Sequence, residues 1–190
     1  GIITTIAGNG IAGFSGDGDS AINAMLNYPY GITVDPWGNI LFADVNNHRI
    51  RRIDTFGIIT TIAGTGNTAY FGQDTLATSG NLYAPTGVEV DHEGNIYIAA
   101  LNHHVIRRIN QSGIMSTYAG TGVLGYSGDG NAALLAQLKY PVGMALDPSG
   151  NMYVAEYGNH VIRKIGIVDS PTTTKLGLSI YLQGFYAGTG

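Results

Sequence analysis

The stretch that decides the fold reads Pro29-Tyr30-Gly31-Ile32-Thr33-Val34-Asp35-Pro36-Trp37-Gly38-Asn39-Ile40-Leu41-Phe42-Ala43-Asp44. It holds two short apolar runs, rich in the β-branched and aromatic residues that strands prefer. The turn between the runs combines an Asp that bonds backbone amides, a Pro that presets φ and a Gly that accepts positive φ. A β-hairpin is therefore predicted here.

The hairpin returns without a gap at 85–100 and at 141–156, a period of 56 residues. A third apolar run follows each hairpin, and a Gly-Ile-Ile-Thr-Thr-Ile strand then follows the first. Each unit is thus predicted to be a four-stranded antiparallel meander. Repeated units of this kind are typical of a β-propeller, so the predicted class is all-β with three blades of an incomplete ring. The predicted units are 1–56, 57–112 and 113–168.

The last part of the chain does not follow the repeat. Leu176, Leu178, Ile180 and Leu182 alternate with small or polar residues, which predicts a half-buried strand. We interpret 169–174 as a linker and 175–190 as the start of a further β module. The sequence then reads as an excerpt from a longer polypeptide.

The three units closely resemble NHL repeats, which are named for an Asn-His-Leu motif. Asn47-His48 and Asn159-His160 keep the Asn-His pair, whereas the middle unit has His103-His104. The acidic position of the motif is Asp44 in the first unit, Ala100 in the second and Glu156 in the third. The resemblance implies a six-bladed propeller in most relatives. The long unit also resembles blades of large secreted or cell-surface bacterial proteins, where they serve binding or scaffolding.

The amino-acid composition limits the classes of function that the protein can have. Charged residues make up only 12% of the chain, which suits an extracellular or cell-surface protein or one buried in an assembly. The formal net charge of −4 argues against nucleic acid as a partner. No apolar run approaches the ~20 residues that span a bilayer. The chain has no cysteine, which excludes disulfides and thiolate metal sites.

One histidine stands at the same position of every unit: His48, His104 and His160. They could converge on a metal. The favoured interpretation is structural, with a ring nitrogen bonded to a backbone group of the neighbouring turn, because these residues obey the repeat instead of breaking it. No metal or cofactor is predicted from them.

Each unit has a long Gly-rich connection, at 8–27, 64–83 and 120–139. These connections carry weak calcium candidates, namely Asp17, Asp19 and Asp129, in Ser-Gly-Asp-Gly loops. Calcium takes six to eight oxygen ligands. Neither loop has the later bidentate Glu of an EF-hand, so turn-forming Asp-Gly is the favoured interpretation.

The same connections place Phe14, Tyr70 and Tyr126 at one repeat position. They are predicted either to pack back onto the blade edge or, together with Tyr30, to line a rim that binds a sugar or peptide. Asn110 begins the one Asn-x-Ser/Thr sequon and is a candidate glycosylation site, although turn chemistry is the favoured explanation.

The sequence is consistent with three functions. The favoured one is a non-catalytic module that binds protein or glycan. The second is a structural subunit of an extracellular assembly or filament, in which the Gly1–Gly8 strand of one chain completes the last blade of another. The third is a metal-dependent propeller lyase or hydrolase, which resembles the minority of NHL-type enzymes.

Overall fold

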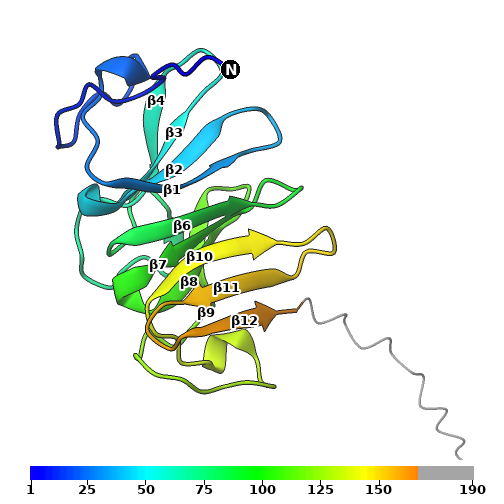
Figure 1. Ribbon diagram of the computed structural model, residues 1–190. Coiled ribbons are helices and arrows are strands. Elements are labelled where there is room, and N and C mark those ends of the chain that lie inside the picture. The colour runs from blue at the N-terminus through cyan, green and yellow to red at the C-terminus, as the bar shows by residue number, and fades with distance from the viewer. Residues whose placement is uncertain (167–190) are drawn as a thin grey trace, which may run out of the picture.

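The computed structural model describes residues 1–166 and contains three antiparallel sheets packed in a row (Figure 1). They confirm the all-β class and the propeller-type blades. Blade 1 consists of β1 (Pro29–Val34), β2 (Ile40–Asp44), β3 (Arg49–Ile53) and β4 (Ile59–Ala63). Blade 2 consists of β6 (Pro85–Val90), β7 (Ile96–Ala100), β8 (Val105–Ile109) and β9 (Ile114–Ala119), with the short β5 (Thr75–Leu76) paired to β9. Blade 3 consists of β10 (Pro141–Leu146), β11 (Met152–Glu156) and β12 (Val161–Ile165).

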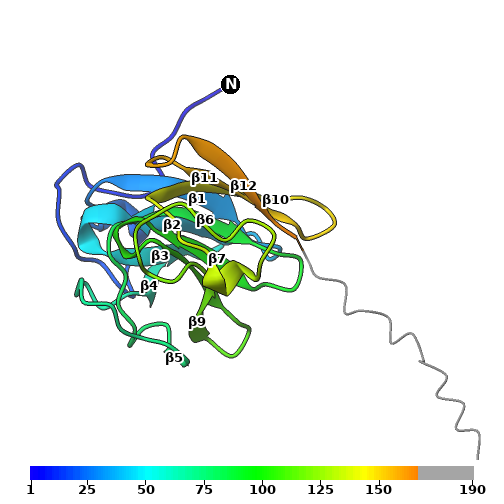
Figure 2. The same ribbon diagram turned by 90° about the horizontal axis from the view of Figure 1, so that it is seen from below.

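The first strand of each blade packs on the first strand of the next, because β6 contacts both β1 and β10. Seen from below, these inner strands lie on one side of the molecule and β4, β5 and β9 on the other (Figure 2). The only helices within residues 1–166 are single 3₁₀ turns: η1 (Ala21–Asn23), η2 (Val45–Asn47), η3 (Leu101–His103) and η4 (Ala133–Leu135). The predicted β module at 175–190 lies outside the described residues.

The hairpin turns form as their residues predict. Asp35 accepts the backbone N–H groups of Trp37 and Asn39 at 3.0 and 2.8 Å, and its second oxygen accepts the Asn39 side-chain amide at 2.7 Å. The same set of bonds recurs at Asp147, where the Asn151 amide holds the pKa of the carboxyl below its usual range. These turns set the register of each hairpin, so that Val34 pairs with Ile40 in blade 1.

The main hydrophobic clusters lie between neighbouring blades. Leu41 and Ile50 of blade 1 pack with Val88 and Ile98 of blade 2, and all four are buried. A second cluster joins blades 2 and 3 in the same way. Each fully buried side chain of this size stabilises the fold by about 1.5–3 kcal/mol. A single blade would lose this burial on both faces and would not be stable alone.

The two ends of the row are open. Ile32 of blade 1 is 64% exposed, whereas Val88, its equivalent in blade 2, is 3% exposed. At the other end Ile162 is 69% exposed, whereas Ile50 is fully buried. The first face of blade 1 and the last face of blade 3 therefore have the residues of blade–blade contacts but no neighbour within residues 1–166.

One sequence prediction is corrected at the N-terminus. The strand predicted over Gly1–Gly8 is not formed, and Ile2 and Ile3 are 96% and 98% exposed. A strand needs a partner for its backbone groups. Within residues 1–166 the Gly8 N–H donates to the Ala21 carbonyl at 2.9 Å, and residues 1–7 pair with no strand.

Candidate binding surface

An arginine on the third strand of each blade anchors the long connection to that blade. The three are Arg51, Arg107 and Arg163, spaced by the 56-residue period. The side chain of Arg51 is fully buried, Arg107 is 1% exposed, and the Arg163 side chain is 12% exposed. A buried guanidinium requires charged or hydrogen-bonding partners, so the neighbours of each arginine define the site.

In blade 1 the partners are two carboxylates. Arg51 donates to Asp44 of β2 at 3.2 Å, and to Asp17 of the connection at 2.9 Å. Asp44 is also fully buried, and it accepts the backbone N–H of Asn27 at 2.7 Å and the side chain of Asn47 at 2.8 Å. The network thus joins the connection, the hairpin and η2 into one unit.

Blade 3 repeats this arrangement. Arg163 lies 3.3 Å from Glu156 and 2.7 Å from Asp129, and it donates to the carbonyl of Ser127 at 3.0 Å. Asn159 donates to Glu156 at 2.5 Å and to the Gly125 carbonyl at 2.8 Å. The acidic position of the NHL motif therefore serves to neutralise a buried arginine.

Blade 2 departs from the pattern at every acidic position. Ala100 replaces the motif acid and Gln73 replaces the acid of the connection. Arg107 donates instead to Thr117 Oγ1 at 2.8 Å, to the Tyr70 hydroxyl at 3.4 Å and to the Gly72 carbonyl. Burial lowers the pKa of Arg107, and no carboxylate within residues 1–166 lies at ion-pair distance from it.

The same blade carries a cluster of imidazole and phenol rings. His103 replaces the motif Asn, and its Nε2 lies 2.9 Å from the Thr68 carbonyl, so the proton of the neutral ring sits on Nε2. Its Nδ1 is buried without a hydrogen-bond partner within residues 1–166, and burial lowers the pKa of the ring. Tyr70 and Tyr83 contact His103 edge to face at 5.0 and 5.9 Å between centroids.

Sequence reasoning missed this cluster as a site. The available signal was that three departures from the repeat, at positions 73, 100 and 103, fall in one unit. The residues are far apart along the chain, and only the folded connection brings them to one arginine.

The aromatic residues predicted for the rim both pack on the blade and remain open to solvent. The Phe14 ring lies 3.8 Å from the Arg49 guanidinium carbon, and Tyr70 and Tyr126 each lie 5.6 Å from the arginine of their own blade. Cation–π contact of this kind fixes the ring without covering it. The exposed fractions are 40% for Phe14, 53% for Tyr70 and 57% for Tyr126. Tyr30 lies elsewhere, on β1, and is 67% exposed.

The calcium candidates have other partners in the structure. The carboxylates of Asp17 and Asp129 form the ion pairs with Arg51 and Arg163 described above, so a cation there would have to displace a guanidinium. Asp19 is exposed, and its carbonyl accepts the N–H of Ile59 at 3.0 Å. Within residues 1–166 no three His, Asp or Glu side chains come together as a metal site.

Asn110 forms a turn of its own. Its side-chain oxygen accepts the N–H groups of Ser112 and Ile114, both at 3.0 Å. Asp54 makes the same two bonds at the corresponding turn of blade 1. The residue is exposed, so the turn and the candidate glycosylation site are compatible in space.

Two of the repeated histidines bond a backbone group, and that group lies in the next blade, whereas the sequence predicted a bond to the neighbouring turn. His48 Nδ1 accepts the backbone N–H of Ala84 at 3.2 Å, and His104 Nδ1 accepts that of Tyr140 at 3.4 Å. Burial lowers the pKa of both rings, which favours the neutral form that can accept. His48 and His104 therefore act as links between blades.

The amino-acid sequence of the chain is similar to those of known proteins. Residues 10–71 match the family model described as the teneurin NHL domain. The chain is 27% identical to mouse teneurin-1 over 229 aligned positions, covering 79% of this chain and 8% of that protein. It is 36% identical to human NHL repeat-containing protein 2 over 96 positions, covering 48% of this chain and 13% of that protein.

Solved structures share the fold. A crystallised Bacteroides thetaiotaomicron protein of unknown function superposes with a TM-score of 0.65 at 25% identity, covering 77% of this chain and 37% of the other. An auxiliary nutrient binding protein from the same species superposes with a TM-score of 0.58 at 24% identity, covering 71% of this chain and 36% of the other. The chain thus spans less than half of each of these four proteins. No helix within residues 1–166 is long and apolar enough to cross a membrane.

Proposed function

Because the repeats of this chain are NHL-type β-propeller repeats, we propose that it is a non-catalytic binding module for a protein or a glycan, located outside the cell or at its surface. The observation that carries the proposal is the series of exposed aromatic rings on the connections of three consecutive blades, each fixed over an arginine. We name Phe14, Tyr70 and Tyr126 together the aromatic rim.

The aromatic rim has the physical properties of a recognition surface. An aromatic ring offers a large contact area, and holding it in place beforehand lowers the entropy lost on binding. In blade 2 the rings of Tyr70 and Tyr83 both contact His103, and Tyr83 is 38% exposed. Tyrosines also present a hydroxyl at the edge of the ring, which suits both peptide and sugar partners.

The non-catalytic part of the proposal is supported by carboxylates and histidine rings that already have structural partners. Asp44, Glu156, Asp17 and Asp129 all neutralise arginines, and the Nδ1 atoms of the linking histidines accept backbone N–H groups. A carboxylate that serves as a structural counter-ion is a poor general base, because releasing it strands a buried cation. The extracellular location is supported by the low share of charged residues, 12%.

Binding is tested by probing the purified chain against arrays of immobilised glycans and of extracellular protein domains. A specific partner should lose at least tenfold in affinity with Tyr83→Ala or Tyr126→Ala, since truncating an aromatic anchor costs about 2 kcal/mol or more. Phe56→Ala is the matched control, because Phe56 is 89% exposed but lies on the β3–β4 turn. Equal loss in the control, or turnover of any arrayed compound, would contradict the proposal.

A further inference from the structure

The acid of the NHL motif and the buried arginine stand in the same backbone frame in all three blades. The register of β2 on β3 puts Asp44 diagonally across from Arg51. The register of β7 on β8 is the same, so Ala100 stands diagonally across from Arg107. The pairing of β11 with β12 repeats it in blade 3. We call the place of the Asp44 carboxylate, and the equivalent place in the other two blades, the acid position.

Three donors surround the acid position in blade 1, where Asp44 lies. Its carboxylate accepts a bond from the backbone N–H of Asn27 at 2.7 Å, from the side-chain amide of Asn47 at 2.8 Å and from Arg51 at 3.2 Å. The donors come from the connection, from η2 and from β3. A negative charge at this point therefore satisfies three separate segments at once.

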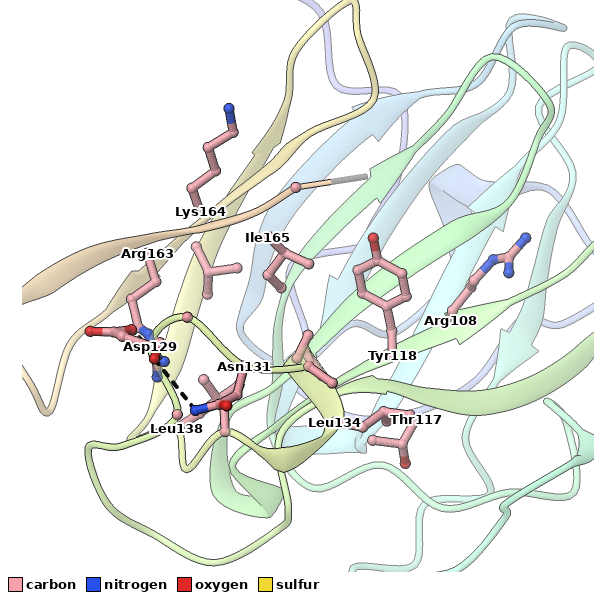
Figure 3. Close-up of a pocket in the computed structure, with 18 of the residues that line it drawn as sticks. Arg108, Thr117, Tyr118, Asp129, Asn131, Leu134, Leu138, Arg163, Lys164 and Ile165 are labelled. Atoms are coloured by element: carbon pink, nitrogen blue, oxygen red, sulfur yellow. Dashed lines mark hydrogen bonds and ion pairs between the residues drawn. The ribbon is translucent and has the colours of Figure 1, made fainter. Parts of the chain in front are cut away.

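Blade 3 has the same three donors around Glu156. The backbone N–H of Lys139 donates to it at 3.0 Å, the side chain of Asn159 at 2.5 Å and Arg163 at 3.3 Å. Figure 3 shows Arg163 together with its second acid, Asp129 of the connection, at one edge of a cavity in this blade. The three donors thus bind a carboxylate in two blades out of the three.

The backbone that carries the first donor is the same in blade 2. Tyr83 takes the place of Asn27, and its carbonyl accepts the N–H of Asn102 at 3.3 Å, as the Asn27 carbonyl accepts that of Asn46 at 3.1 Å. The Tyr83 N–H is therefore directed to the acid position, where Ala100 offers no oxygen. Within residues 1–166 this N–H has no hydrogen-bond partner, whereas its equivalents in blades 1 and 3 bond a carboxylate.

The other two donor positions of blade 2 hold basic groups. Arg107 is buried at 1% exposure, and its hydrogen bonds within residues 1–166 go to neutral oxygens. The carboxylate of Asp74 acts on its charge, but it is exposed and lies beyond ion-pair distance. His103 replaces the motif Asn, and the charged groups that act on its ring are Arg107, His104 and His48, all of them basic. The acid position of blade 2 therefore lies among cationic and neutral groups.

We propose that the acid position of blade 2 binds a small monovalent anion, which is chloride in ordinary saline solution. The anion accepts the Tyr83 N–H and lies against the Arg107 guanidinium, as the Asp44 carboxylate lies between the same two kinds of group in blade 1. A water molecule would satisfy the N–H but would leave the buried guanidinium without a counter-charge, which is costly. The anion joins the connection of blade 2 to β8 as Asp44 joins the connection of blade 1 to β3.

Thermal unfolding in two sodium salts tests the proposal. At constant ionic strength, replacing the bulky gluconate ion by chloride should raise the midpoint by about 3–5 °C for each tenfold rise in chloride above its dissociation constant. Ala100→Asp is the matched variant: its carboxylate takes the place of the anion, so its midpoint should not respond to chloride. Arg107→Met removes the cation and should lose the response as well, which decides the matter if the aspartate variant does not fold. Equal wild-type midpoints in the two salts, or an equal response in wild type and variants, would overturn the proposal.

Bromide locates the anion directly, because it replaces chloride and scatters X-rays anomalously. Crystals of the wild-type protein soaked in sodium bromide should show an anomalous peak within hydrogen-bond distance of both the Tyr83 backbone nitrogen and the Arg107 guanidinium. Crystals of Ala100→Asp, soaked in the same way, should show no peak there. Bromide found only at other surface positions of the wild-type protein would be an adventitious ion only, and it would overturn the proposal.

Discussion

The guanidinium of Arg51 lies 3.2 Å from the carboxylate of Asp44, and neither side chain is exposed to solvent. The corresponding pair in blade 3, Arg163 and Glu156, lies at 3.3 Å. In blade 2 the arginine is kept, but an alanine stands where the acid would be. The same buried arginine therefore has a carboxylate partner in blades 1 and 3 and, within residues 1–166, none in blade 2. Variants of these arginines can show what the carboxylate contributes to stability.

Removing the arginine should cost more in blade 1 than in blade 2. Arg51→Met leaves Asp44 buried without its cation, so we expect the free energy of unfolding to fall by about 3–5 kcal/mol. Arg107→Met leaves no carboxylate behind and should cost clearly less. Urea denaturation followed by the fluorescence of Trp37, the one tryptophan, measures both. Equal losses would show that Asp44 is not held by the ion pair.

Restoring the acid in blade 2 should stabilise the protein. Ala100→Asp places a carboxylate beside Arg107, and hydrogen bonds to charged groups contribute about 1.5–3 kcal/mol each. We therefore expect a higher midpoint in thermal unfolding. Ala99→Asp is the matched control: Ala99 is also fully buried, but its neighbour on β8 is Ile106, so the new charge would be unpaired and destabilising. A lower midpoint for Ala100→Asp would contradict the inference that Arg107 lacks a partner.

Stability should fall as the pH drops below about 6.5, the ordinary pKa of histidine. Burial lowers the pKa of His48, His103 and His104 in the folded protein. Between the lowered folded pKa and the ordinary unfolded pKa, the unfolded chain binds more protons, so acid favours unfolding. The contribution of these rings is fully present above pH 6.5 and is lost progressively below it.

His103→Asn tests this assignment, because Asn is the residue of the other two blades at that position. Comparing urea midpoints at pH 7.5 and pH 5.5 should show a smaller pH effect in the variant than in the wild type. An unchanged pH effect would mean that His103 does not contribute to it.

Glycines at one repeat position show how closely neighbouring blades pack. A Cβ on Gly31 would meet the Thr86 carbonyl of the next blade, and a Cβ on Gly87 would meet the Val142 carbonyl at 2.7 Å. Gly31→Ala and Gly87→Ala should therefore lower the midpoint of thermal unfolding. Within residues 1–166 a Cβ on Gly143 meets only Ala155, at 3.9 Å, so Gly143→Ala is the matched control and should leave the midpoint unchanged. An equal loss in all three variants would contradict this account of blade packing.

Periodicity was sufficient to predict the blades because each local signal repeats three times. The Asp-x-x-Gly-Asn turn and the alternating strands depend on residues close in sequence, and each pattern returns one period later. Such contacts can be inferred by counting along the chain. The repeat also aligned Phe14, Tyr70 and Tyr126, although it left open whether they pack or remain exposed.

The buried arginine networks could not be predicted in this way. Asp17 and Arg51 are 34 residues apart, and their contact depends on how the connection folds back onto the blade. The consequence of Ala100 likewise depends on Arg107 being buried, and burial is a property of packed neighbours, not of a residue type.

The amino-acid sequence alone therefore determined the all-β class, the blades and their order, because turn chemistry and strand alternation act over a few residues. Tertiary structure alone decided which charges are paired and which aromatic rings stay exposed. The physical reason is that desolvation and unsatisfied backbone groups arise only when segments far apart in the chain are brought into contact.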